Sequence, residues 1–273
     1  MSNYDKINPK EIQDFSNIIY DISPSYSGIA CGLSKGEVYT NDVKQPKIAV
    51  VYSEPVGGFS VLGKFETKED VNDFEVFIKD ELFPNLLEKG WEYFEFSTTE
   101  DSTLSTILSL FPDKCMESEI EYSFRMGGNI QDVIIPDGYQ ILPVDEQLLD
   151  HRENGNIENI SMLKEIIDNS WDSKENFLSS SMAYVAVYND RIVAVIVGTS
   201  RFHQFVPIDI VTEENHQKKG LASALTLAFL HECRKRGLIA QWDCVESNLA
   251  SQKTAKKCGF KLFRERTYYW FKI

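Results

Sequence analysis

Apolar residues along the second half of the chain follow spacings that predict alternating strands and helices. Tyr139–Val144 is a short apolar segment typical of a strand, and Asn156–Trp171 has apolar residues at intervals of three and four, as a helix does. Met182–Tyr188 and Arg191–Gly198 are rich in β-branched residues. The pair Asn189-Asp190 joins them and suits a tight turn, so these two segments are expected to form a hairpin.

The same alternation continues to the end of the sequence. The remaining predicted elements are a short helix at Lys174–Leu178, a strand at Val206–Thr212, a helix at Leu221–Arg236, a strand at Leu238–Val245, a helix at Asn248–Lys257 and a last strand ending in TYYWFKI. From Tyr139 onward the predicted order is therefore β, α, α, β, β, β, α, β, α, β.

The first half shows a similar pattern at an offset of 147 residues. Gly90 then falls on Gly237, and each follows a helical segment and precedes an aromatic-containing strand, WEYFEFS or LIAQWDC. Upstream, SVLGKF lies against IDIVT, and downstream Tyr122 meets Tyr269. The match predicts two related α/β units, of which the first has KEDVNDF where the second has a glycine loop. The alternative is a chance recurrence of helix and strand order.

A connection between the two units is predicted from turn-forming residues. The segment RMGGNIQDVIIPDG, Arg125 to Gly138, contains two adjacent glycines, an Asn and a Pro-Asp-Gly sequence. We therefore expect an N-terminal α/β unit at residues 1–125, a linker at 126–137 and a second unit at 138–273.

Acidic residues dominate the composition, and their excess lies entirely in the first half. The 273 residues include 42 Asp and Glu against 28 Lys and Arg, a net charge of −14. Residues 1–137 hold 25 acidic and 11 basic residues, whereas the remainder holds 17 of each. This charge disfavours nucleic acid and anionic membranes as partners. It favours a cationic small molecule, although acidity that only maintains solubility is an equal alternative.

Other features of composition narrow the class of protein. The hydrophobic content of 42% is too high for a disordered chain, and the longest apolar run, Ile192–Gly198, is too short to span a membrane. Met1–Lys10 is polar and has no signal-peptide pattern, so a cytoplasmic location is expected. The five cysteines follow no disulfide or zinc-ligand spacing, and neither a disulfide framework nor a metal site is predicted.

The most specific chemical signal is the junction between a strand and a helix in Ile208–Leu230. The strand leads into a loop containing Gly220, and a strongly apolar helix starts directly after it. Backbone N–H groups at the start of a helix have no intrahelical partner and carry positive potential, so they suit a pyrophosphate. The small residues Gly220 and Ala222 would let an anion approach those amides. An ordinary capped turn is the structural alternative.

Together with later motifs, this loop resembles that of the GNAT superfamily of acetyl-CoA-dependent N-acetyltransferases. The resemblance rests on IVTxxxxQKKGLA, on NxxSxxxAKKCGF and on the strand order, and it covers residues 138–273. Nucleotide-loop patterns such as GxGxxG and GxxxxGK[ST] are absent from the sequence. The WDC triplet and the PDGY sequence resemble a bacterial subgroup that includes zwittermicin-resistance acetyltransferases. The implied fold is a mixed, mainly antiparallel sheet flanked by helices, with a degenerate GNAT-like first unit.

The resemblance implies which residues bind acetyl-CoA. Ile210, Val211 and Thr212 match the strand that pairs with the pantetheine arm, and Asn248 and Ser251 match positions that reach pantetheine or phosphate groups. The pyrophosphate loop is matched by Gln217, Lys218, Lys219, Gly220, Leu221, Ala222 and Ser223. Nearby basic residues suited to the phosphates are Lys253, Lys256 and Lys257.

Catalysis by direct attack of an amine on the thioester requires a proton acceptor and a donor to the departing thiolate. The family's usual donor is a tyrosine four residues before the Gly-Phe pair, where this sequence has Ala255. Tyr268 or Tyr269 on the last strand is a candidate substitute, and adjacent strand residues face opposite sides. The candidate bases are Glu246 and Asp209, with Asp243 ranked third.

These observations predict an N-acetyltransferase that transfers an acetyl group from acetyl-CoA to a primary amine of a small cationic molecule. The alternative is an acyl-CoA-binding sensor that lacks competent acid and base residues, as Ala255 would permit. The two differ in whether a carboxylate and a proton donor converge at the acetyl position.

Overall fold

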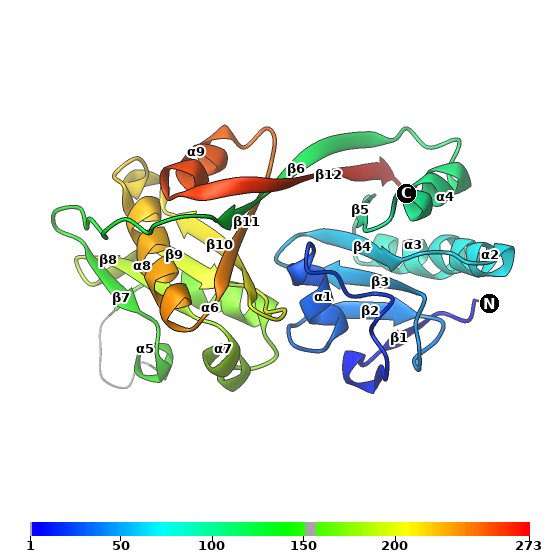
Figure 1. The fold of residues 1–273 in the computed structure, drawn as a ribbon, viewed down its shortest axis with the longest axis horizontal. Helices are drawn as coiled ribbons and strands as arrows, with labels where there is room; N and C mark the ends of the chain where they lie inside the picture. The colour runs from blue at the N-terminus through cyan, green and yellow to red at the C-terminus, as the bar shows by residue number, and fades with distance from the viewer. Residues whose placement is uncertain (1, 151–156) are drawn as a thin grey trace. The chain divides into compact units, whose positions relative to one another are not determined.

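The computed structural model describes residues 2–150 and 157–273, and these form two compact units (Figure 1). The first comprises Met1–Glu121 with Arg266–Ile273, and the second comprises Tyr122–Glu265. Within the described residues, no helix combines the length and the apolar character needed to cross a membrane.

The first unit is a sheet flanked by helices. Its strands are β1 (Asp5–Ile7), β2 (Glu37–Thr40), β3 (Ile48–Ser53), β4 (Gly58–Gly63), β5 (Tyr93–Thr98), the start of β6 (Glu117–Met126) and the end of β12 (Phe260–Lys272). Its helices are η1 (Pro9–Glu11), α1 (Pro24–Ala30), α2 (Lys68–Val76), η2 (Phe77–Leu82), α3 (Phe83–Glu88) and α4 (Asp101–Leu110).

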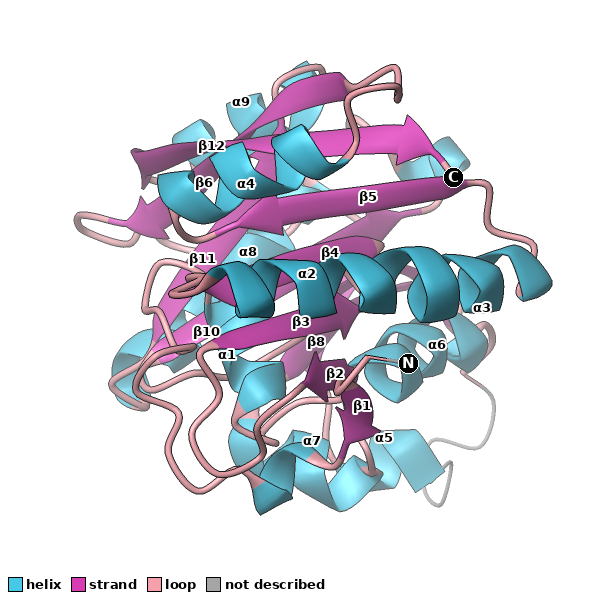
Figure 2. Ribbon diagram, turned by 90° about the vertical axis from the view of Figure 1, so that its right-hand side faces the viewer, coloured by secondary structure: helices cyan, strands magenta, loops and turns pink. Residues whose placement is uncertain are grey.

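Helices α2, η2 and α3 form one continuous rod along the sheet of the first unit (Figure 2). Its middle turn, Phe77–Leu82, is a π-helix, and the N–H of Phe83 bonds to the carbonyl of Ile78, five residues back. Pro84 follows within the rod and has no N–H to donate, so the regular ladder is interrupted at this point. The buried aromatic residues Phe74, Phe77 and Phe83 of this rod join the main core of the unit.

The second unit has a sheet covered by helices on both faces. Its strands are β7 (Gln140–Pro143), β8 (Ala183–Tyr188), β9 (Arg191–Gly198), β10 (Phe205–Thr212), β11 (Ile239–Val245), the end of β6 and the start of β12. Its helices are α5 (Glu146–Asp150), α6 (Ile160–Ser170), α7 (Lys174–Ser180), η3 (Glu214–His216), α8 (Leu221–Lys235) and α9 (Leu249–Lys257).

Two hydrophobic clusters fix the faces of this second sheet. Alternating strand residues such as Ile196, Ala240 and Trp242 pack with α8 and α9, whereas Val195 and Val197 pack with α6 and α7. Outside the register shift opposite Ala186 and Val187, where Val193 is an extra residue, this alternation assigns the residues of a strand to one of the two faces.

The predicted helices and strands of the second half all form, but the predicted order lacks the short helix α5, which follows β7. The Asn189-Asp190 turn has positive φ angles of 47° and 58°, which is the conformation that a two-residue hairpin turn needs. The predicted helix Asn156–Trp171 forms as Ile160–Ser170, and its predicted first residue, Asn156, lies outside the described residues.

The two units, each taken alone, have the same sequence of strand directions. In the first unit β2, β3 and β4 are antiparallel and β4 is parallel to β5; in the second β8, β9 and β10 are antiparallel and β10 is parallel to β11. Adding 147 to the bounds of β4 and α4 gives residues 205–210 and 248–257, which fall on β10 and α9. The two units therefore share one topology.

Each unit takes a strand from the opposite half of the chain. In the first, the order runs β1-β2-β3-β4-β5-β12, and Tyr269–Lys272 of β12 pair antiparallel with β5. In the second, the order runs β7-β8-β9-β10-β11-β6, so residues 122–126 of β6 flank β11. The units thus differ from the predicted segments 1–125 and 138–273. Hydrophobic spacing within a strand does not specify its partner, and for this reason the sequence did not predict the exchange.

The predicted linker, residues 126–137, contains no helix or strand after Met126 and is packed. Ile130 and Val133 contact the core beneath α8, and the carbonyl of Gln131 is 3.0 Å from His231 Nε2. The Pro-Asp-Gly turn forms as predicted, with Gly138 at φ +81°. The segment therefore belongs to the surface of the second unit.

The strand exchange predicts that a substitution near the C-terminus weakens the first unit. Phe271 is fully buried against Phe83, Phe94 and Phe111, so Phe271→Ala should lower the unfolding free energy by about 3–5 kcal/mol. Amide hydrogen exchange should show loss of protection in β5 and unchanged protection in β9. The exposed Leu262→Ala is the control on the same strand. Equal loss of protection in β9 would contradict the assignment of this strand.

Candidate active site

Strands β10 and β11 separate at the middle of the second unit. They pair in parallel only from Phe205 to Pro207, opposite Ile239 to Gln241. Beyond these residues β10 continues to pair with β9 on its other side, as far as Thr212. The separation leaves an opening between two adjacent strands of the sheet.

Backbone groups of β10 point into this opening at alternate residues. The N–H of Thr199, the residue after β9, donates to the carbonyl of Pro207 at 2.9 Å, so the backbone of Pro207 faces the β9 side. Because the direction alternates along an antiparallel pair, the backbone groups of Ile208, Ile210 and Thr212 face the opening. Such groups are suited to a ligand that binds like an added strand.

Helix α8 begins beside the opening without a side-chain cap. Its N-cap is Gly220, at φ +89°, a left-handed conformation that favours glycine. The first intrahelical bond joins the N–H of Ala224 to the carbonyl of Gly220. The N–H groups of Leu221, Ala222 and Ser223 precede that bond, so they are available to an anion.

A pocket of about 550 Å³ joins the opening to this helix start. Its wall is formed by Ile210, Thr212, His216, Gln217, Lys218, Gly220, Leu221, Ala222, Ser223, Trp242, Asn248, Ala250, Ser251, Lys253, Thr254 and Lys257. Ten of the twelve residues predicted to bind the cofactor are in this wall. The two others are Lys219 and Val211; Val211 is 40% exposed and, by strand alternation, on the face opposite Ile210.

Helix α9 supplies the second side of the pocket. Asn248 caps it, because its side-chain oxygen accepts from the N–H of Ser251 at 3.0 Å, and the same residue lines the pocket. The indole N–H of Trp242 donates to Ser251 Oγ at 2.8 Å. This bond fixes the serine hydroxyl on the pocket wall.

Sequence reasoning did not identify Trp242, Ala250 and Thr254 as part of the wall. Ala250, Thr254 and Lys257 recur at helical spacing on α9, and this small or basic stripe was the available signal. Trp242 has no such signal, because a buried aromatic residue on a strand is usually a core residue.

Asp209 lies on β10 within the opened stretch. Its Oδ1 accepts from the N–H of Ile210 at 2.8 Å, and that N–H faces the opening. Burial raises the pKa of Asp209, and the hydrogen bond from Ile210 opposes this rise. The carboxylate therefore lies at the edge of the opening with an increased affinity for a proton.

The other predicted catalytic residues lie elsewhere. Glu246 is exposed, accepts from the hydroxyl of Tyr122 at 3.1 Å and does not line the pocket. Tyr269 stacks on Phe96 in the core of the first unit, with ring centroids 5.8 Å apart. The structure therefore brings neither residue to the pocket of the second unit.

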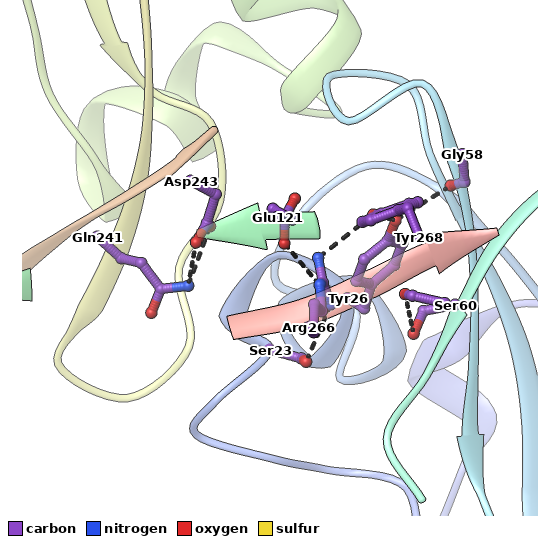
Figure 3. Close-up of polar contacts among 10 residues, drawn as sticks. Ser23, Tyr26, Gly58, Ser60, Glu121, Gln241, Asp243, Arg266 and Tyr268 are labelled. Atoms are coloured by element: carbon purple, nitrogen blue, oxygen red, sulfur yellow. Dashed lines mark hydrogen bonds and ion pairs between the residues drawn. The ribbon is translucent and has the colours of Figure 1, made fainter. Parts of the chain in front are cut away.

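The neighbouring Tyr268 is also committed to the first unit (Figure 3). Its hydroxyl is 2.5 Å from that of Tyr26 and 3.3 Å from Arg266, which pairs with Glu121. Burial raises the pKa of Tyr268 to about 12. This tyrosine belongs to a buried polar network, and the structure assigns it no place at the pocket.

Comparison with known proteins identifies the family. The family model described as GNAT acetyltransferase matches residues 24–269. The chain belongs to the GNAT acetyltransferase family. The match includes both units, so it extends beyond the second-half motifs that carried the resemblance.

Relatives of this GNAT protein agree in length and fold. An uncharacterized N-acetyltransferase of Bacillus subtilis (strain 168), YdfB, is 25% identical over 235 residues, which are 86% of this chain and 85% of that protein. A GCN5-related N-acetyltransferase-like protein from Streptococcus suis 89/1591 has a TM-score of 0.60 at 19% identity, over 87% of this chain and 88% of the other. A tandem GNAT protein from the clavulanic acid biosynthesis pathway has a TM-score of 0.54 at 10% identity, over 87% and 83%.

The corresponding region of the first GNAT unit is closed. Strands β4 and β5 stay together, because the N–H of Thr99 bonds to the carbonyl of Val61 and the N–H of Gly63 to Thr99 Oγ1. The start of α2 is satisfied by a capping box in which Thr67 and Asp70 exchange hydrogen bonds of 3.1 and 2.8 Å. The first unit therefore lacks the opening and the free helix start seen in the second.

The raised pKa of Asp209 predicts a pH-dependent effect on stability. A carboxyl whose pKa is raised in the folded state stabilises the fold below its unfolded pKa, near 4, and this contribution is lost as the pH rises through the folded pKa. Asp209→Asn stays neutral, so it should be more stable than the wild type at pH 7, and the difference should shrink toward pH 4. Urea unfolding at both pH values measures this. Asp190→Asn in the exposed hairpin turn is the control, and an Asp209→Asn protein less stable at pH 7 contradicts the prediction.

Proposed function

We propose that the protein is an acetyl-CoA-dependent N-acetyltransferase whose acceptor is a primary amine of a small cationic molecule. The observation that carries this proposal is the opening between β10 and β11 directly beside the uncapped start of α8. Family membership supports acetyl transfer, and the local geometry supports the cosubstrate and the position of the reaction.

The residues around the pocket fit the chemistry of acetyl-CoA. Backbone groups of Ile208 and the carbonyl of Ile210 would pair with the amides of pantetheine in the opening, because the N–H of Ile210 already bonds to Asp209. The N–H groups of residues 221–223 would hold the pyrophosphate at the positive end of the α8 dipole. Lys218, Lys253 and Lys257 on the wall would balance the remaining phosphate charge.

Asp209 and the pocket occupy opposite sides of the opening. Ile210 and Trp242 line the pocket on the α8 and α9 face, whereas Asp209 alternates with Ile208 and Ile210 and so faces the other way. We infer that the acceptor approaches from the Asp209 face. An amine on that side would reach the opening without displacing the cosubstrate, which favours direct transfer.

Asp209 is the proposed general base. When bound, acetyl-CoA supplies a thioester carbonyl that is activated toward nucleophiles. Asp209 takes one proton from the ammonium of the acceptor, which frees the nitrogen lone pair for the new C–N bond. The C–S bond breaks, and the sulfur takes the second proton that the nitrogen loses. The raised pKa of Asp209 makes this carboxylate a better proton acceptor than an exposed one.

A sensor that binds acyl-CoA without turnover is the second candidate function. The observation that favours it is Ala255, which is fully buried in the core where the family's tyrosine donor would stand. Release of free thiol from acetyl-CoA in the presence of amines distinguishes an enzyme from a sensor. The cytoplasmic location and the narrower resemblance to zwittermicin-resistance acetyltransferases both stay predictions.

Gly220→Asp tests the cosubstrate site. A side chain at φ +89° is strained, and its negative charge would repel the pyrophosphate, so acetyl-CoA affinity should fall at least about 100-fold. Isothermal titration of the folded protein measures this. Gly237→Asp, at φ +66° with no atom near its Cβ position, carries the same charge and similar strain away from the pocket, and it should bind normally. Equal affinity in both variants would falsify the site.

Asp209→Asn tests the base. The variant should keep its acetyl-CoA affinity and lose about 100-fold or more in kcat, since it cannot accept a proton. In the wild type, protonation of Asp209 should lower the rate of thiol release at acidic pH. This decline should be absent from the pH profile of the variant. A kcat within a factor of three of the wild type, with the same decline in rate at acidic pH, would exclude this role.

A further inference from the structure

Asp209 has a counterpart on the other side of the opening. Pro207 and Gln241 are the last residues in register on the two parallel strands, so their side chains share a face. Two residues further along each strand stand Asp209 and Asp243, which continue on that same face. Ala240, Trp242 and Cys244 pack toward α8, and this confirms that Asp243 points away from the pocket.

The side chain of Asp243 is held by an amide (Figure 3). Gln241 Nε2 donates to both carboxylate oxygens of Asp243, at 3.1 and 3.0 Å. Gln241 Oε1 accepts from Arg125 Nε at 2.9 Å, which fixes the orientation of the amide, because only its oxygen can face that donor. The NH₂ group must then face Asp243.

Arg125 is itself fixed in place. Its guanidinium lies 3.7 Å from the ring centroid of Phe205 and 4.1 Å from that of Phe263, between two aromatic faces. Arg125 comes from the part of β6 that flanks β11. The carboxylate of Asp243 is therefore positioned at the opening by a rigid support, in which Arg125 holds Gln241 and Gln241 holds Asp243.

The two carboxylates differ in their surroundings. Asp209 is a partly buried group that we assign to proton transfer. Among the described residues, no cationic group forms an ion pair with Asp243; the nearest support is the neutral Gln241, with Arg125 on its far side. A carboxylate held by a neutral donor keeps its charge available for a cation.

We propose that the acceptor is a diamine or polyamine, held by one ammonium on Asp243 while its second amino group reacts at Asp209. This inference rests on the proposed function. Paired strands lie about 4.8 Å apart, and these two separate beyond their last pair, so the backbones that carry Asp209 and Asp243 are more than about 5 Å apart. A few methylene groups between two nitrogens span such a distance.

Paired acceptors test the proposal directly. Thiol release from acetyl-CoA would be measured with 1,4-diaminobutane and with butylamine, which has the same chain and one amino group. The wild type should favour the diamine in kcat/KM by about 10- to 100-fold, as one charged hydrogen bond predicts. Asp243→Asn should remove that preference, because KM should rise much more for the diamine than for butylamine.

Two further variants separate the positioning of Asp243 from general effects of lost charge. Gln241→Met keeps the length of the side chain but cannot donate, so it should reduce the diamine preference in the same direction; it also serves if Asp243→Asn does not fold. Asp190→Asn removes one charge from the exposed turn of the same unit and should keep the full preference.

The outcomes distinguish this inference from the proposed function. A wild type that releases thiol with both amines at similar kcat/KM overturns the diamine inference and leaves the transferase intact. An equal fall in kcat/KM for both amines in Asp243→Asn also overturns the diamine inference, because it indicates that Asp243 has a structural role. Binding of acetyl-CoA without thiol release for any amine overturns the proposed transferase, and this inference with it.

Discussion

The pairing of β5 with β12, and of β11 with β6, is the constraint on which the rest of the structure depends. Each unit completes its sheet with a strand from the opposite half of the chain. Phe271 enters the aromatic core of the first unit through this pairing, and Arg125 reaches Gln241 in the second. Neither half of the sequence contains all the residues of one unit. The aromatic core of the first unit and the contact of Arg125 with Gln241 in the second therefore both depend on a strand from the opposite half of the chain.

The shared topology has been used differently in the two units. In the first, Thr99 keeps β4 and β5 together and the Thr67–Asp70 capping box satisfies the start of α2. In the second, the strands separate after Pro207 and Gly220 leaves the start of α8 free. The first unit thus has hydrogen bonds between its strands where the strands of the second unit have separated. A small number of local bonds therefore decides which unit keeps a separated strand pair and an uncapped helix start.

Sequence patterns predicted the local features well, because each depends on a few adjacent residues. The Asn189-Asp190 turn, the helix that starts near Asn248 and the glycine loop before α8 all have short-range physical causes. Strand exchange was not predictable, since apolar alternation in β12 is the same whichever strand it joins. Because the end of β12 joins the first unit, Tyr269 stacks on Phe96 there. Glu246 is exposed in the turn after β11, where it accepts a hydrogen bond from Tyr122. The support of Asp243 needed a residue 118 positions away, Arg125, and no spacing rule connects them.

Strand exchange also sets an order on biosynthesis. The first unit needs Arg266–Ile273, which the ribosome makes only after every residue of the second unit. The second unit takes residues 122–126 from a segment already synthesised, so it has all its strands as soon as residue 265 is available. Until then β5 exposes an edge with unpaired backbone groups, which is a site of aggregation in nascent chains. The half of the protein that is translated first is consequently the half that finishes folding last.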